Sequence, residues 1–147
     1  MPSIDSIDSV QIEAPREHVY DVIRDYPNMH TWFSKYRCKL TQGDTVEEGS
    51  RVQHQVNALG ATTRFVRTVH KLVPGERIEE TYDEGDIVGK GVWTFEEQDG
   101  WTTASFHCQV RSNSLLGHIG FAIGGELAHK LVYRGLLAAL KIKCELD

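Results

Sequence analysis

The sequence has few cysteines, no cluster of basic residues and no long hydrophobic run. Cys38, Cys108 and Cys144 are odd in number, far apart and without a CxxC pair, which favours buried or inert thiols over disulfides or a zinc site. No stretch approaches the ~20 consecutive apolar residues that cross a bilayer. The pattern therefore excludes a disulfide-rich module and an integral membrane segment.

Positive charge is also in short supply. The chain has 16 Lys and Arg against 21 Asp and Glu, a formal net charge of -5. Nucleic-acid binding depends on clustered Lys and Arg that neutralise phosphates, so no nucleic-acid partner is expected. The first ten residues carry acids where a secretory signal carries basic residues, and we expect the chain to stay in the cytoplasm.

The common catalytic motifs are missing as well. There is no nucleophile elbow, P-loop or dinucleotide fingerprint, and Gly89-Lys90-Gly91 lies inside a predicted strand instead of before a helix. His118 and His129 lie about three helical turns apart, too far to share one metal ion. We predict no metal and no cofactor.

What is present is a chain of 147 residues, 40% of them hydrophobic, which is enough for one domain spanning residues 1–147. A strand over residues 5–13 leads to Pro15, which suits a first helical turn. A helical stripe of Val19, Val22, Ile23 and Tyr26 ends at Pro27, and Asn28 resembles the N-cap of a second short helix.

The middle of the chain alternates strand-like segments with turn residues. We predict strands over residues 36–41, 50–58, 62–72, 77–83, 88–97 and 101–112, joined as an antiparallel meander. A helix of about thirty residues then runs to Cys144, with an apolar face formed by Leu116, Ile119, Ile123, Leu127, Leu131, Leu137 and Leu140. Glycines near its start weaken the helix, and whether that segment gates a cavity stays open. The fold class is α+β, with helices on one side of the sheet.

Four short motifs in this order resemble one known superfamily. They are IEAP (12–15) before VYDVIRD (19–25), Trp32 in the second short helix, LVPGERI (72–78), and GVWTF (91–95) before the Asp99-Gly100 turn. The chain is similar to the helix-grip (START-like, SRPBCC) superfamily, which includes birch-pollen-allergen-like proteins and the polyketide cyclase/dehydrase and lipid-transport group. The resemblance implies a curved sheet of about seven strands wrapped around a long C-terminal helix, with a cavity between them. It assigns no catalytic residue.

Strand alternation predicts which side chains face that cavity. His54 falls on an inward face, Glu80 and Tyr82 share another, and His107 should face solvent. Residues 62–72 are ambiguous, and we lean to Phe65, Arg67 and Val69 as the inward set. The expected ligand-binding residues are Trp32, His54, Arg67, Glu80, Tyr82, Trp93, Phe106, Phe121, Ile123 and Leu127.

A buried carboxylate needs a partner or a proton, and Arg67 and His54 on neighbouring strands answer that need for Glu80. Glu80, His54 and Arg67 are therefore the catalytic candidates, either orienting a ligand oxygen or moving a proton. The alternative is a structural ion pair, just as the aromatic residues can be simple core.

Three functions follow from this pattern. The first is binding of a small hydrophobic molecule such as a lipid, quinone or polyketide, and the second is an enzyme of the polyketide cyclase/dehydratase kind. A protein-interaction module is the third, although the polar outer face of the last strand gives it little support. The sequence leaves open the ligand, any reaction and the oligomeric state.

Overall fold

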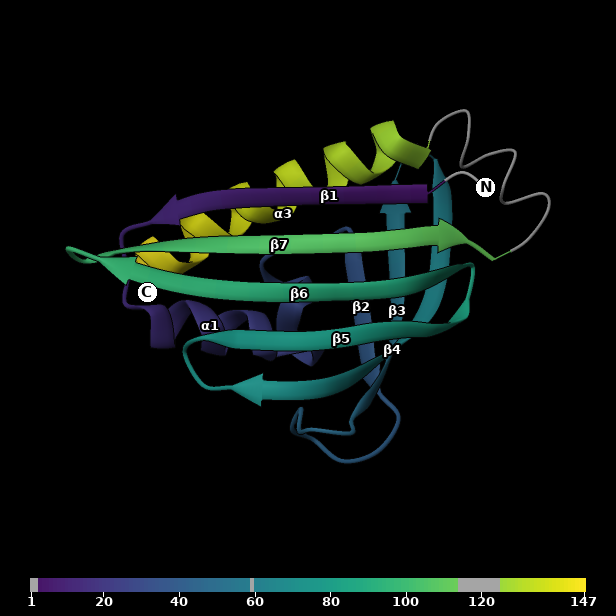
Figure 1. Ribbon diagram of the computed structural model, residues 1–147, viewed down its shortest axis with the longest axis horizontal. Coiled ribbons are helices and arrows are strands. Elements are labelled where there is room, and N and C mark those ends of the chain that lie inside the picture. The colour runs from purple at the N-terminus through teal and green to yellow at the C-terminus, as the bar shows by residue number, and fades with distance from the viewer. Residues whose placement is uncertain (1–2, 59, 114–124) are drawn as a thin grey trace.

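The computed structural model describes residues 3–58, 60–113 and 125–147. Their core is a seven-stranded antiparallel sheet in the order β1-β7-β6-β5-β4-β3-β2. The strands are β1 (Ser3–Ile12), β2 (Tyr36–Leu40), β3 (Arg51–Ala58), β4 (Ala61–Val73), β5 (Arg77–Gly85), β6 (Ile87–Gln98) and β7 (Trp101–Ser112). The predicted meander is confirmed, with consecutive strands from β2 to β7 paired to each other and β1 returning beside β7 (Figure 1).

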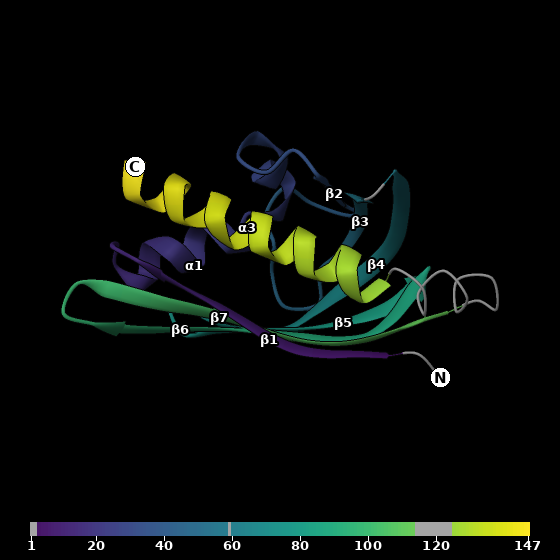
Figure 2. The ribbon, with the colours of Figure 1, turned by 90° about the horizontal axis from the view of Figure 1, so that it is seen from above.

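The helices lie together on one side of this sheet. They are α1 (Arg16–Arg24), the 3-10 helix η1 (Tyr26–Thr31) and the long C-terminal helix α3 (Glu126–Leu146). Figure 2 shows α3 lying across the sheet while β2, β3 and β4 curl up toward it. The two short helices after the first strand and the long C-terminal helix are as predicted.

The short connections have the backbone that their residues predict. Asp99 and Gly100 both have positive φ, 54° and 82°, in the turn that joins β6 to β7. Two such residues in succession match the right-handed twist of a hairpin, and Asp-Gly is a favoured pair there.

The second short helix differs in detail from the prediction. It begins at Tyr26, before Pro27, and is a 3-10 helix, so Asn28 lies inside it. The Asn28 side chain donates a hydrogen bond to Asp25 at 2.9 Å instead of capping the backbone. Proline at the start suits a first turn because it needs no N–H donor there.

The apolar face of α3 is the main correction to the predicted fold. Leu127 and Leu131 are 56% and 42% exposed, although we expected them on the buried face. A six-residue step from Leu131 to Leu137 turns the helix by about 240°, so the predicted set joined two different faces. The face that packs on the sheet consists of Val132, Tyr133, Leu136, Leu137, Leu140 and Cys144. The predicted start of this helix, over residues 116–124, lies outside the described residues.

Candidate functional site

A small inner pocket lies between the sheet and the first turns of α3. Its volume is about 130 Å³, and β2 to β7, β1 and α3 all contribute to its wall. Most of the lining is apolar: Ile4, Val56, Ala58, Phe65, Ile87, Val110, Ala128 and Val132. Polar atoms come from tyrosines, Thr63, Cys108 and His129. An apolar wall with a few polar groups is typical of small-molecule sites.

Two tyrosines from opposite sides of the pocket meet at its wall. Tyr36 on β2 and Tyr133 on α3 are buried, and their hydroxyls lie close enough to influence each other's pKa. Burial raises the pKa of both phenols, so neither hydroxyl ionises near neutral pH. Tyr133 also stacks on Phe106, with ring centroids 5.0 Å apart. The pocket therefore offers neutral hydroxyls in an aromatic surrounding.

The predicted polar residues form a separate buried cluster. Nη1 of Arg67 on β4 lies 2.9 Å from Oε2 of Glu80 on β5, and both side chains are almost fully buried, at 3% and 0% exposed. The Tyr26 hydroxyl donates a 2.7 Å hydrogen bond to Oε1 of Glu80, and the Arg67 guanidinium lies 4.3 Å from the Tyr26 ring centroid. Burial raises the pKa of Glu80, while Arg67 and Tyr26 oppose that rise by stabilising the carboxylate. The lean toward an inward Arg67 is confirmed.

His54 on β3 extends this cluster toward β2. Nη2 of Arg67 lies 3.0 Å from Nδ1 of His54, and the Cys38 sulfur lies 3.0 Å from the same nitrogen. Because arginine only donates, Nδ1 is the acceptor and the ring proton sits on Nε2. Burial first, and then the charge of Arg67, lower the pKa of His54 well below its usual value. Burial raises the pKa of Cys38 to about 11, so this thiol is not an activated nucleophile.

An aromatic layer separates the cluster from the inner pocket. His54 packs between the rings of Tyr36 and Phe65, with centroids 4.3 and 4.7 Å away. Tyr36 and Phe65 line the pocket, whereas His54, Arg67 and Glu80 are not among its lining residues. The sequence predicted a single polar spot inside the cavity. The structure instead has two neighbouring regions, the mostly apolar inner pocket and the buried polar cluster.

Tyr82 on β5 is the predicted residue that touches both regions. Its ring lines the pocket and stands edge-on to Phe65, with centroids 5.1 Å apart. Its buried hydroxyl lies close enough to Glu80 to help lower that pKa, but no atom of the described residues completes a well-formed hydrogen bond with it. Gly91 leaves the space for this hydroxyl, because a Cβ there would lie 2.6 Å from it.

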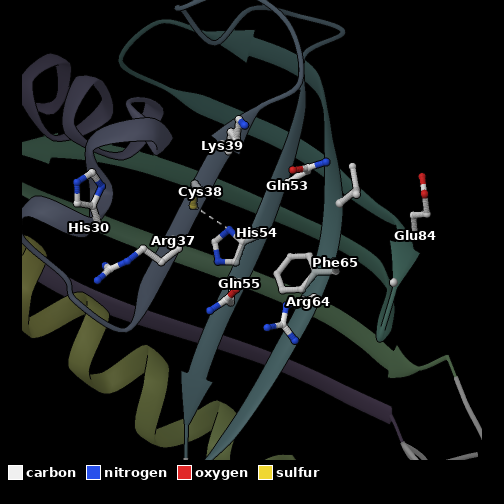
Figure 3. A pocket seen from close by; sticks show the side chains of 12 residues that line it. His30, Arg37, Cys38, Lys39, Gln53, His54, Gln55, Arg64, Phe65 and Glu84 are labelled. Carbon is white, nitrogen blue, oxygen red and sulfur yellow. Dashed lines mark hydrogen bonds between the residues drawn. The ribbon is translucent and has the colours of Figure 1, made fainter.

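A wider hollow of about 770 Å³ lies over β2, β3 and β4 (Figure 3). Figure 3 shows His54 between Cys38 and Phe65, with longer polar side chains around them. Most side chains that line the hollow are exposed and polar or charged, and they include His30, Arg37, Lys39, Gln53, Arg64 and Glu84. A polar, solvent-exposed lining suits an apolar ligand less well than the inner pocket does.

The remaining predicted ligand-binding residues lie away from the pocket wall. Trp93 and Phe106 are buried in the core against each other, with centroids 4.7 Å apart. Trp32 is half-buried and packs on Phe33. Leu127 points largely into solvent. Phe121 and Ile123 lie outside the described residues.

Several residues of the site were missed by reasoning from the sequence. Tyr36 and Cys38 share the inward face of β2, and strand alternation would have found both. Tyr26 appeared only as the end of an apolar stripe. Tyr133 follows His129 by one helical turn, but it was missed because the buried face of the helix was predicted wrongly.

Within residues 3–58, 60–113 and 125–147 no group of His, Cys, Asp and Glu side chains could hold a metal, and no helix is long and apolar enough to span a membrane.

The arrangement of a curved antiparallel sheet around a long C-terminal helix defines a helix-grip domain. A family model described as polyketide cyclase / dehydrase and lipid transport matches residues 4–145. The chain belongs to this family. A search of curated proteins finds no match.

Solved structures share the fold at low sequence identity. The Zhui aromatase/cyclase from Streptomyces sp. R1128 matches with a TM-score of 0.82 and 16% identity, over 97% of this chain and 94% of that one. A START superfamily protein from Mycobacterium smegmatis matches with a TM-score of 0.74 and 15% identity, over 97% of each chain. Ara h 8.0201 matches with a TM-score of 0.68 and 9% identity, over 99% of each chain. At these identities the likeness shows the fold alone.

Proposed function

We propose that this protein binds a small apolar molecule in the inner pocket between the sheet and α3. The observation that carries the proposal is a pocket of about 130 Å³ whose wall is mostly aliphatic and aromatic. Removing apolar ligand surface from water supplies the driving force, roughly 25 cal/mol per Å². Family membership agrees with hydrophobic ligand binding but names no ligand.

Native mass spectrometry of the purified protein, followed by organic extraction, tests this proposal. We expect a stoichiometric apolar mass bound to the protein. Ala128→Phe should abolish it, because Ala128 lines the pocket from α3 and a phenyl ring there occupies the space of the ligand. Ala139→Phe is the matched control, since Ala139 is half-buried on the same helix but does not line the pocket.

A clear negative result is possible. A protein that arrives empty and takes up no apolar compound, from toluene to palmitate, would contradict the proposal. Binding that Ala128→Phe leaves unchanged would place the ligand elsewhere. Thermal unfolding of both variants checks that each is folded before binding is compared.

A second candidate function is acid–base catalysis of the polyketide cyclase/dehydratase kind. The buried Glu80, with its raised pKa and its contact to Tyr82, is the observation in its favour. Against it, Glu80, His54 and Arg67 lie behind the aromatic layer and not on the pocket wall. A poly-β-keto thioester substrate tests this alternative. Cyclisation that survives Glu80→Gln and Tyr82→Phe would eliminate these groups as its acid and base.

A further inference from the structure

The volume of the inner pocket, as the described residues form it, matches a single ring. A dry engineered cavity of ~150 Å³ binds benzene, whereas pockets for larger ligands span ~300–1,000 Å³. The inner pocket, at about 130 Å³, belongs with the first group. A long acyl chain or a fused polycycle would leave most of its surface outside and lose most of its hydrophobic driving force.

The wall of the pocket favours an aromatic ring. Tyr36, Phe65, Tyr82 and Tyr133 come from β2, β4, β5 and α3 and all line it. Phe65 and Tyr82 already form an edge-to-face pair with an interplanar angle of 73°. Aromatic rings prefer such arrangements and gain ~0.5–1.5 kcal/mol beyond simple burial. A ligand ring can continue this packing, while a flexible aliphatic ligand cannot.

The hydroxyl pair of Tyr36 and Tyr133 supplies the polar part of the site. Two phenols carry two protons, and an interaction between the two hydroxyls can use at most one of them. In the portions of the chain that are described, no other hydrogen-bond partner is found for either hydroxyl. One O–H donor and several lone pairs therefore remain for a ligand oxygen beside the apolar wall.

The charge of the lining selects a neutral ligand. Both tyrosines remain uncharged because burial raises the pKa of each, and the Arg67 guanidinium is already engaged with Glu80 behind the aromatic layer. No Lys or Arg is among the residues that line the pocket, so an anionic carboxylate would lose its hydration without gaining a permanent positive charge there. A hydroxyl can instead both donate to and accept from the tyrosine pair.

We propose that the ligand of the inner pocket is a neutral monocyclic phenol, with its ring among the four aromatic side chains and its hydroxyl hydrogen-bonded to Tyr36 and Tyr133. This inference rests on the proposed binding function and adds the class of ligand. It sets this pocket apart from one that holds an entire lipid or a polycyclic aromatic product.

Titration calorimetry with p-cresol, toluene, benzoate and palmitate tests the inference. We expect p-cresol to bind about fivefold more tightly than toluene, the effect of one net hydrogen bond of ~1 kcal/mol. Benzoate and palmitate should bind more weakly than either. The double variant Tyr36→Phe/Tyr133→Phe should remove the advantage of p-cresol and leave toluene binding unchanged, because either phenol alone still carries an O–H donor. Tyr20→Phe is the control, because Tyr20 is equally buried but packs on Phe95 outside the pocket.

The outcomes separate the two proposals. Palmitate binding more tightly than p-cresol, and lost in Ala128→Phe, would overturn the ligand class and keep the binding function. Equal affinities for p-cresol and toluene would overturn the role of the tyrosine pair. No binding of any of the four compounds would overturn the binding function itself. If the double variant does not fold, Tyr36→Phe and Tyr133→Phe taken singly should each reduce the advantage of p-cresol over toluene, and an unchanged advantage in both would overturn the role of the pair.

Discussion

The space between the sheet and the helices holds two regions with opposite characters. In the buried cluster, Arg67 and Glu80 carry full charges that neutralise each other at 2.9 Å, with Tyr26 and His54 completing the contacts. In the inner pocket, neutral tyrosines and aliphatic side chains surround empty space. The charged side chains of the cluster therefore connect β4 with β5, whereas uncharged aromatic and aliphatic side chains form most of the pocket wall.

Breaking the ion pair of the cluster should give the largest effect. Arg67→Met leaves Glu80 buried without its cation, and removing one partner of a buried pair costs ~3–5 kcal/mol of unfolding free energy. Urea unfolding measures the change. The control is Arg51→Met, because Arg51 pairs with Glu84 between β3 and β5 but the two side chains are 47% and 65% exposed. An exposed pair contributes about 0–1 kcal/mol. Equal losses in the two variants would contradict the distinction.

Acidification should weaken the same region through His54. Its pKa is held well below 6.5 in the folded protein, so below about pH 6.5 the unfolded chain takes up a proton that the folded chain does not. Stability therefore falls as pH falls, by up to ~1.4 kcal/mol per pH unit. His54→Gln should reduce the slope of unfolding free energy against pH by about one proton.

His30→Gln is the matched control for that pH dependence. His30 is exposed and hydrogen-bonds only to the carbonyl of Pro27 among the described residues, so this variant removes a histidine without touching the buried cluster. Slopes are compared, so a general loss of stability in either variant does not affect the result. An unchanged slope in His54→Gln would mean that His54 is protonated in the folded protein.

The smallest effect is expected where the two regions meet. Tyr82→Phe removes a buried hydroxyl that has no well-formed hydrogen bond, so little stabilising energy is lost and a desolvation cost disappears. We expect unfolding free energy to change by less than ~1 kcal/mol. Urea unfolding beside Tyr26→Phe checks this, because Tyr26 donates to Glu80 at 2.7 Å and its loss should cost more, ~1–3 kcal/mol. A larger loss in Tyr82→Phe would show that its hydroxyl is bound.

Local periodicity predicted most of the fold and part of the site. Alternation placed His54, Glu80 and Tyr82 inward, because a strand has only two faces, while the ambiguous residues 62–72 gave only a lean toward an inward Arg67. The pairing of Arg67 with Glu80 on neighbouring strands was also predicted, whereas the hydrogen bond from Tyr26 in η1 to Glu80 spans 54 positions and no local pattern encodes it.

The pocket was harder to predict because it forms where short side chains leave space unfilled. Ala128 and Val56 mark it only by being too short to fill the space, and their sequence neighbours give no sign of that. The prediction of the buried face of α3 was wrong for a different reason. Apolar residues occur nearly all round α3, so periodicity alone could not separate the exposed Leu131 from the buried Leu137.

The buried contact between Arg67 and Glu80 also restricts how this sequence can change over time. Replacing either residue first produces a chain with an uncompensated charge in its interior, which costs ~3–5 kcal/mol out of a typical domain stability of ~5–15 kcal/mol. An apolar pair in these two positions is physically acceptable, but the route to it passes through an unstable intermediate. Among relatives of this protein, positions 67 and 80 should therefore vary together or remain as they are.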